Sequence, residues 1–253
     1  MPESGNGSSS QPSAGVLRRL RRYPVKGMAG EDLSEAYVSF AGILGDRVYA
    51  FTSPDAPADF PWMTARIWRG MLLLKPRFLD APPAQERVDP SRYRAEVLTP
   101  EGERFGVDEP RFLEYLQKKF GRELTFHFSE RSMQDTRPVS IFGVKTIESL
   151  SKETGMELDV RRFRSNLLVD WLDERPFFEE TLLNRRVRIG NSLELMMVKK
   201  DQRCVVITLN PDTGEPSPQV FEAVTKNHGS CAGMYAAVLR EGVIRPGDAV
   251  FVD

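Results

Sequence analysis

The chain has 253 residues, 40% of them hydrophobic and 28% charged, which is ordinary for a globular protein and sufficient for one large domain or two closely packed ones. The formal net charge of −1 gives no reason to expect a nucleic-acid partner, and no stretch approaches the roughly 20 apolar residues that span a membrane. The 2 cysteines exclude a disulfide framework, a structural zinc site and an iron–sulfur cluster held by four thiolates.

Residues 1–15 are rich in serine, glycine and proline and contain no apolar stretch. Such a segment buries little apolar surface, and it lacks the hydrophobic core of a secretory signal. We therefore expect a disordered leader over residues 1–15 of a cytoplasmic protein.

The first ordered segment, residues 16–23, is basic and leads into a Pro-Val-Lys-Gly turn at residues 24–27. Proline limits regular structure there, and Gly27 allows the backbone to approach a ligand closely, so Lys26 can reach an anion. Residues 32–39 are predicted to form a strand, and a glycine-framed turn containing Arg47 leads into another that ends at residue 51. Taken alone, Lys26 and Arg47 also fit solvated charges at strand ends.

Further strands are predicted at residues 62–66, 71–75 and 93–98, and an amphipathic helix at residues 109–120. The helix has Phe112, Leu116 and Phe120 on one face and a glycine directly after its last turn. A second helix is predicted at residues 144–154.

Two polar segments frame this second helix. Thr136 and Arg137 precede a proline before it, and Arg164 and Asn166 come directly before a predicted buried strand at residues 167–170. The planar fork of Arg164 suits bidentate contacts to a phosphate, and Asn166 can both donate and accept hydrogen bonds.

Strands at residues 182–190 and 193–198 lead to Gln202, Arg203 and Cys204. The apolar run at 205–209 and the Asn-Pro-Asp-Thr-Gly turn at 210–214 predict a buried strand that enters a tight turn. Positive charge from Arg203 favours the thiolate form of Cys204, which binds soft metals or attacks electrophiles. Alternatively, Cys204 is a small apolar residue at the start of a core strand.

The remaining segments contain few candidate functional residues. Residues 220–225 fit a strand or a short helix, and a glycine-rich stretch at 227–235 precedes the last strands. His228 and Cys231 are too few for a second metal site. A Cys/His hydrolase is disfavoured because no motif ties His127 or His228 to Cys204.

The phrase at residues 202–214 resembles the signature of the MOSC domain, the C-terminal domain of molybdenum-cofactor sulfurases. More narrowly, it resembles the branch of the mitochondrial amidoxime-reducing components and their bacterial relatives. Matching segments occur in the same order at residues 24–26, 45–47, 64–66, 136–138, 163–166 and 247–250. The chain departs from the family pattern at Ile67, where glutamine is usual, at Arg137, where a small hydroxyl residue is common, and at Ser165, where proline is usual.

This resemblance implies a mixed α/β, mainly β fold, with a β-rich region at residues 16–125 and a β-barrel-like MOSC domain at residues 126–253. The two regions are expected to form one unit with a cofactor site in the cleft between them. The implied cofactor is molybdopterin with molybdenum, and Cys204 is the implied metal ligand and catalytic residue. The implied cofactor-binding residues are Lys26, Gly27, Arg47, Thr136, Arg137, Arg164, Asn166, Gln202 and Arg203.

The implied function is a molybdenum-cofactor-dependent oxidoreductase that reduces N-hydroxylated substrates such as amidoximes and hydroxylamines. Because the chain has no iron–sulfur or flavin motif, its electrons are expected from a separate partner of reductase, ferredoxin or cytochrome type. The alternative is a carrier, either of the molybdenum cofactor or of a persulfide on Cys204, without turnover.

Overall fold

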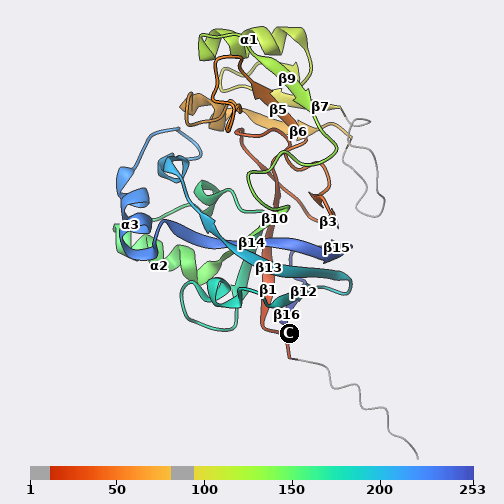
Figure 1. The fold of residues 1–253 in the computed structure, drawn as a ribbon, viewed down its shortest axis with the longest axis vertical. Helices are drawn as coiled ribbons and strands as arrows, with labels where there is room; N and C mark the ends of the chain where they lie inside the picture. The colour runs from red at the N-terminus through yellow and green to blue at the C-terminus, as the bar shows by residue number, and fades with distance from the viewer. Residues whose placement is uncertain (1–11, 81–93) are drawn as a thin grey trace, which may run out of the picture.

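The computed structural model of the protein describes residues 12–80 and 94–253. In the lower half of Figure 1, seven strands of this part close into a barrel in the order β11-β10-β14-β13-β12-β16-β1, and the pairing of β1 with β11 completes the ring. The barrel strands are β1 (Gly15–Arg22), β10 (Val139–Gly143), β11 (Leu167–Trp171), β12 (Arg186–Ile189), β13 (Leu193–Gln202), β14 (Cys231–Arg240) and β16 (Ala249–Val252).

Alternating side chains fill the barrel interior. In β13, for example, Leu193, Leu195 and Met197 are fully buried, whereas the residues between them are only partly buried. This period of two is what a strand with one buried face requires. The mainly β, mixed fold predicted from the sequence is confirmed.

One rim of the barrel collects three segments that are far apart in the sequence. Strand β1 ends at this rim, and β10 and β11 begin there, as the pairings of Leu20 with Leu167 and Ile141 with Leu167 show. Strand β14 runs antiparallel to β10, and its first residue, Cys231, pairs with Gln202 at the end of β13. The chain therefore brings the residues just outside these strands to one place.

The N-terminal region lies above this rim in Figure 1. It contains the pair β5 (Tyr49–Thr52) and β9 (Thr125–Phe128), the sheet β6 (Lys75–Phe78), β7 (Ala95–Leu98) and β8 (Arg104–Gly106), the helix α1 (Pro110–Phe120) and the 3-10 helix η1 (Arg69–Leu73). Phe51, Phe112 and Leu116 belong to its separate core. The short strands β2 (Glu31–Asp32), β3 (Ala36–Ser39), β4 (Gly42–Ile43) and β15 (Gly242–Ile244) complete the described strands.

Two helices flank the barrel, α2 (Val144–Thr154) and α3 (Pro218–His228), and they lie together at the left of Figure 1. Leu150, Val220 and Val224 belong to the core that they share. Short 3-10 helices connect the strands: η3 (Val160–Phe163), η4 (Phe178–Leu182) and η5 (Val205–Thr208). No helix in the described ranges is long and apolar enough to cross a membrane.

Both predicted helices are confirmed, as α1 and α2, and the helical alternative at residues 220–225 is correct. The predicted strand pair at residues 62–66 and 71–75 is wrong. Trp62 makes only an isolated bridge with Thr52, and the chain then turns into η1. Most of the predicted leader and the first residue of the strand predicted at 93–98 lie outside the described residues.

The predicted buried strand at residues 205–209 is also wrong, because these residues form η5. Ile207 packs into the core beside α2 and α3, whereas Val205 is 52% exposed. A single helical turn buries one side of this run and leaves the other in solvent, which a run of apolar letters does not reveal. The tight turn that follows is confirmed, since the Asn210 side chain accepts hydrogen bonds from the backbone N–H groups of Asp212 and Thr213.

Candidate functional site

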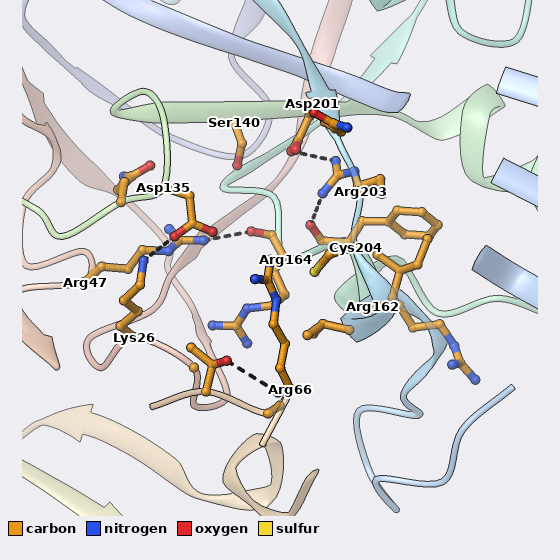
Figure 2. A pocket seen from close by; sticks show the side chains of 18 of the residues that line it. Lys26, Arg47, Arg66, Asp135, Ser140, Arg162, Arg164, Asp201, Arg203 and Cys204 are labelled. Atoms are coloured by element: carbon orange, nitrogen blue, oxygen red, sulfur yellow. Dashed lines mark hydrogen bonds and ion pairs between the residues drawn. The ribbon is translucent and has the colours of Figure 1, made fainter. Parts of the chain in front are cut away.

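A cavity lies between the barrel rim and the N-terminal region, and Cys204 is in its wall. The cavity has a volume of about 130 Å³ that water-sized groups can enter. Figure 2 shows Lys26, Arg47 and Asp135 on one side, with Asp201, Arg203 and Cys204 on the other. The lining residues are Lys26, Gly27, Arg47, Phe60, Thr64, Ala65, Arg66, Gln134, Asp135, Ser140, Arg162, Phe163, Arg164, Asp201, Gln202, Arg203, Cys204, Val206, Ile207 and Tyr235.

Cys204 is a free, half-buried thiol between β13 and η5. Its carbonyl accepts a hydrogen bond of 3.2 Å from the N–H of Ile207, and the preceding N–H of Arg203 donates to the carbonyl of Ser230 at 2.7 Å. The backbone on both sides of the sulfur is therefore anchored. A thiol held in this way is suited to act as a metal ligand or nucleophile.

The Arg203 side chain is engaged by the protein itself. Its Nε donates to the carbonyl of Ala232 at 2.7 Å and its Nη1 to the carbonyl of Phe163 at 2.6 Å. Its Nη2 lies 2.8 Å from a carboxylate oxygen of Asp201, as an ion pair without hydrogen-bond geometry. Arg203 thus ties the Cys204 segment to β14 and to the turn before Arg164.

Arg164 has a donor with no partner. It follows η3 in the left-handed conformation, with φ of 52°, and its Nη1 donates to the carbonyl of Met28 at 2.6 Å. Its Nη2 is buried and has no hydrogen-bond partner among the described residues. Burial lowers the pKa of Arg164 to about 10, so the guanidinium remains charged at neutral pH.

Arg47 shares the surroundings of Arg164. Both guanidinium groups lie over the ring of Tyr23, at 4.6 and 4.5 Å from its centroid, and Arg47 Nη2 donates to the Arg164 carbonyl at 3.1 Å. Burial opposes the charge of Arg47, but Asp46 at 2.5 Å raises its pKa above the ordinary value. Like Arg164, Arg47 has a positive φ, of 51°, which costs a non-glycine residue on the order of 1 kcal/mol.

Lys26 is 4% exposed, and burial lowers its pKa. Its ammonium group donates to the carbonyl of Met133 at 2.7 Å and forms an ion pair with Asp135. The neighbouring Gly27 has φ of 86°, and a Cβ there would lie 2.9 Å from the sulfur of Met71. Close packing against the protein therefore explains this glycine.

The cavity has an excess of positive charge. Its basic lining residues are Lys26, Arg47, Arg66, Arg162, Arg164 and Arg203, and its acidic ones are Asp135 and Asp201. In Figure 2 the Arg162 side chain extends away from the centre, and its Nη1 donates to the carbonyl of Thr208 at 2.5 Å. The remaining cations are more than two carboxylates can neutralise, so the site favours an anion.

Asp201 is a buried acid in the same wall, 3% exposed. Burial raises its pKa to about 6, although the charge of Arg203 and a hydrogen bond with Tyr235 oppose the shift. Asp201 therefore holds a proton below about pH 6.

We expect the unfolding free energy of the cofactor-free protein to depend on the protonation of Asp201. The folded-state pKa of about 6 lies above the ordinary value of 3.8, so the stabilising contribution is complete below pH 3.8 and is lost as the pH rises through 6. Relative to Asp201→Asn, the wild type should lose up to about 3 kcal/mol of unfolding free energy between pH 4 and pH 7. Urea unfolding of both proteins at these two pH values measures the difference, and parallel pH curves would contradict it.

The structure brings together seven of the residues predicted from the sequence, but it does not bring three others to the cavity. Thr136 and Arg137 are exposed and lie outside it. The side-chain carbonyl of Asn166 accepts hydrogen bonds from the amide and hydroxyl of Ser140, and its NH₂ group donates to the carbonyl of Arg21. These contacts occupy Asn166 inside the barrel wall.

Sequence reasoning missed several lining residues. Phe60, Asp135, Ser140, Asp201 and Tyr235 were not assigned to the site, and no local pattern distinguishes them. The segment at residues 64–66 matched the family pattern, but it was not placed in the site because Ile67 follows it.

Comparison with known proteins connects this geometry to a family. Residues 123–251, just over half of the chain, match the family model of the MOSC domain. Molybdenum cofactor sulfurase of Caenorhabditis briggsae is 28% identical over 124 residues, covering 48% of this chain and 17% of the relative. The protein of the same name from Caenorhabditis elegans is 34% identical over 98 residues, covering 38% and 13%.

This chain spans less than a fifth of the length of these two relatives. Among solved structures, the YUAD protein from Bacillus subtilis aligns over 94% of each chain with a TM-score of 0.51 and 14% sequence identity. That similarity concerns the fold alone.

Proposed function

Because this chain belongs to the MOSC domain family, we propose that it binds a molybdenum–pterin cofactor and reduces N-hydroxylated compounds such as amidoximes and hydroxylamines. The family and the names of its relatives connect the chain to the molybdenum cofactor. The substrate class, the reduction reaction and the separate electron donor go beyond this connection and are part of the proposal.

One observation carries the proposal: Cys204, whose thiol is free, and Arg164, whose buried Nη2 has no hydrogen-bond partner within residues 12–80 and 94–253, line the same cavity. A buried donor without a partner costs free energy, and an anion that accepts its hydrogen bond removes that cost. The cofactor offers both a phosphate for the arginines and a soft metal for the thiolate. The donor set of Arg164, Arg47 and Cys204 therefore fits this group.

We assign the cofactor contacts accordingly. Arg164 and Arg47 would hold the phosphate, with Lys26 free to join them when Asp135 moves aside. Cys204 would be the protein ligand of the metal. Arg203 is a positioning residue, because its fork is occupied by carbonyl groups of the protein.

The bound cofactor would supply two-electron reduction chemistry, and the protein would position it and shield it from solvent. Reduction of an N–OH group to N–H releases water and consumes two protons as well as two electrons. Asp201 lines the cavity and holds a proton on its carboxyl group below about pH 6, so it is suited to deliver one of them.

The proposed reduction requires a source of electrons outside this chain. Two cysteines are too few for an iron–sulfur cluster, so we propose a separate electron-donor protein of reductase, ferredoxin or cytochrome type. Carriage of the cofactor, or of a persulfide on Cys204, remains the competing function.

An anaerobic turnover assay distinguishes a reductase from a carrier. Protein purified from a host that makes the cofactor is mixed with benzamidoxime and reduced methyl viologen, and benzamidine formation is measured by chromatography. We expect catalytic turnover, and none from protein made in a host that lacks cofactor synthesis. A protein with full metal and pterin content that makes no benzamidine would be a carrier.

A further inference from the structure

A second depression opens from the cavity beside Cys204. Ala65, Arg66 and Val206 line both the cavity and this groove, and Val205, which directly follows Cys204, lines the groove. The groove is therefore continuous with the wall that carries the thiol.

The groove has one apolar wall. Its apolar residues are Val205, Val206, Leu209, Pro216, Pro218 and Phe221, contributed by η5, the following turn and the start of α3. Val205 is 52% exposed, although it begins a run of apolar residues. An apolar surface of this kind gains free energy by covering the flat body of an organic molecule.

The groove also has basic residues in its lining. Arg66 and Arg69 come from the segment between Thr64 and η1, and both are exposed. Neither guanidinium has a hydrogen bond or an ion pair within the described part of the chain, and Arg66 lies 4.5 Å from the ring centroid of Phe60. The groove's acidic residue is Glu222. Its charge balance favours a ligand with one negative charge.

We propose that this groove selects substrates, and that the preferred substrate is an N-hydroxylated compound with a flat apolar body and a carboxylate at the far end. The inference rests on the proposed function for the identity of the reacting group. The N–OH end lies in the cavity beside Cys204, the body covers the apolar wall, and the carboxylate meets Arg69. Arg69 lies outside the cavity lining, so it is a specificity residue without a role in cofactor binding.

Binding without turnover tests the groove directly. Cofactor-loaded protein without an electron donor is titrated with benzamidoxime and with 4-carboxybenzamidoxime, and dissociation constants are measured by calorimetry. We expect the carboxylate to bind about 1.5-fold to fivefold more tightly, the range of an exposed charge pair. Arg69→Gln should remove this preference and leave the affinity for benzamidoxime unchanged.

Two further variants sharpen the test. Glu222→Gln should increase the preference, because it removes the negative charge from the groove, and Arg175→Gln should have no effect, because Arg175 is an exposed arginine outside the groove. Equal affinities of the wild type for the two ligands, or an unchanged preference in Arg69→Gln, would overturn the inference.

The titration together with the turnover assay separates the groove from the proposed function. A carboxylate preference that depends on Arg69 in a protein without turnover would support the groove and overturn the reductase. Turnover with no discrimination between the two amidoximes would support the reductase and overturn the groove.

Discussion

Replacing Cys204 with serine is expected to abolish reduction of benzamidoxime while most of the pterin is retained. Serine exchanges a soft sulfur ligand for a hydroxyl that is barely ionised at neutral pH, so a metal held by Cys204 would lose its protein ligand. The proposed phosphate contacts of Arg164 and Arg47 do not involve position 204. Turnover with reduced methyl viologen, pterin content by fluorescence after oxidation, and the visible spectrum of the metal measure the three effects.

Cys231→Ser is the matched control. Cys231 begins β14 opposite Gln202 and lies outside the cavity lining, so its replacement should leave turnover, pterin and spectrum unchanged. A serine variant at position 204 that works at the wild-type rate would remove Cys204 from the mechanism. In that case persulfide loading would be the property to measure.

Replacing Arg164 with alanine is expected to cause the largest loss of bound pterin among the cavity arginines. Its Nη2 is a buried donor without a hydrogen-bond partner among the described residues, and loss of a charge-assisted hydrogen bond costs about 1.5 to 3 kcal/mol, or one to two decades of affinity. Pterin retained after dilution and gel filtration measures this change.

Arg137→Ala supplies the comparison, because Arg137 is exposed and outside the cavity. We expect it to retain pterin as the wild type does. Equal losses in the two variants would show that the phosphate contacts lie elsewhere. The thermal midpoint of each cofactor-free variant checks that a loss of pterin is not a loss of folding.

Local patterns predicted the elements that depend on local interactions. The apolar face and terminal glycine of residues 109–120 were sufficient for α1, and the turn chemistry of residues 210–214 was sufficient for its turn. The closure of the barrel depends on β1 pairing with β11 across about 150 residues of chain, and no local pattern contains that information. The run at residues 205–209 misled because β-branched residues favour strands, whereas burial of Ile207 beside α2 and α3 decided its conformation.

Much of the cavity was predicted because motif segments carry residues suited to a phosphate and a metal. Lys26, Arg47, Arg164 and Cys204 do meet, from segments up to 178 positions apart in the sequence. The partners of polar side chains were not predictable in this way. The carbonyl groups that bind Arg203 and the Ser140 groups that bind Asn166 are brought there by tertiary packing. The side-chain type of Arg203 and Asn166 would suit ligand binding equally well, so the sequence does not distinguish the two roles.

The most direct measurement is the metal and pterin content of the protein purified from a host that makes the molybdenum cofactor. We expect equimolar molybdenum and pterin, close to the concentration of the protein, with the pterin greatly reduced in Arg164→Ala. Folded protein that contains neither, from a host in which another molybdenum enzyme is fully loaded, would contradict a cofactor site in this cavity.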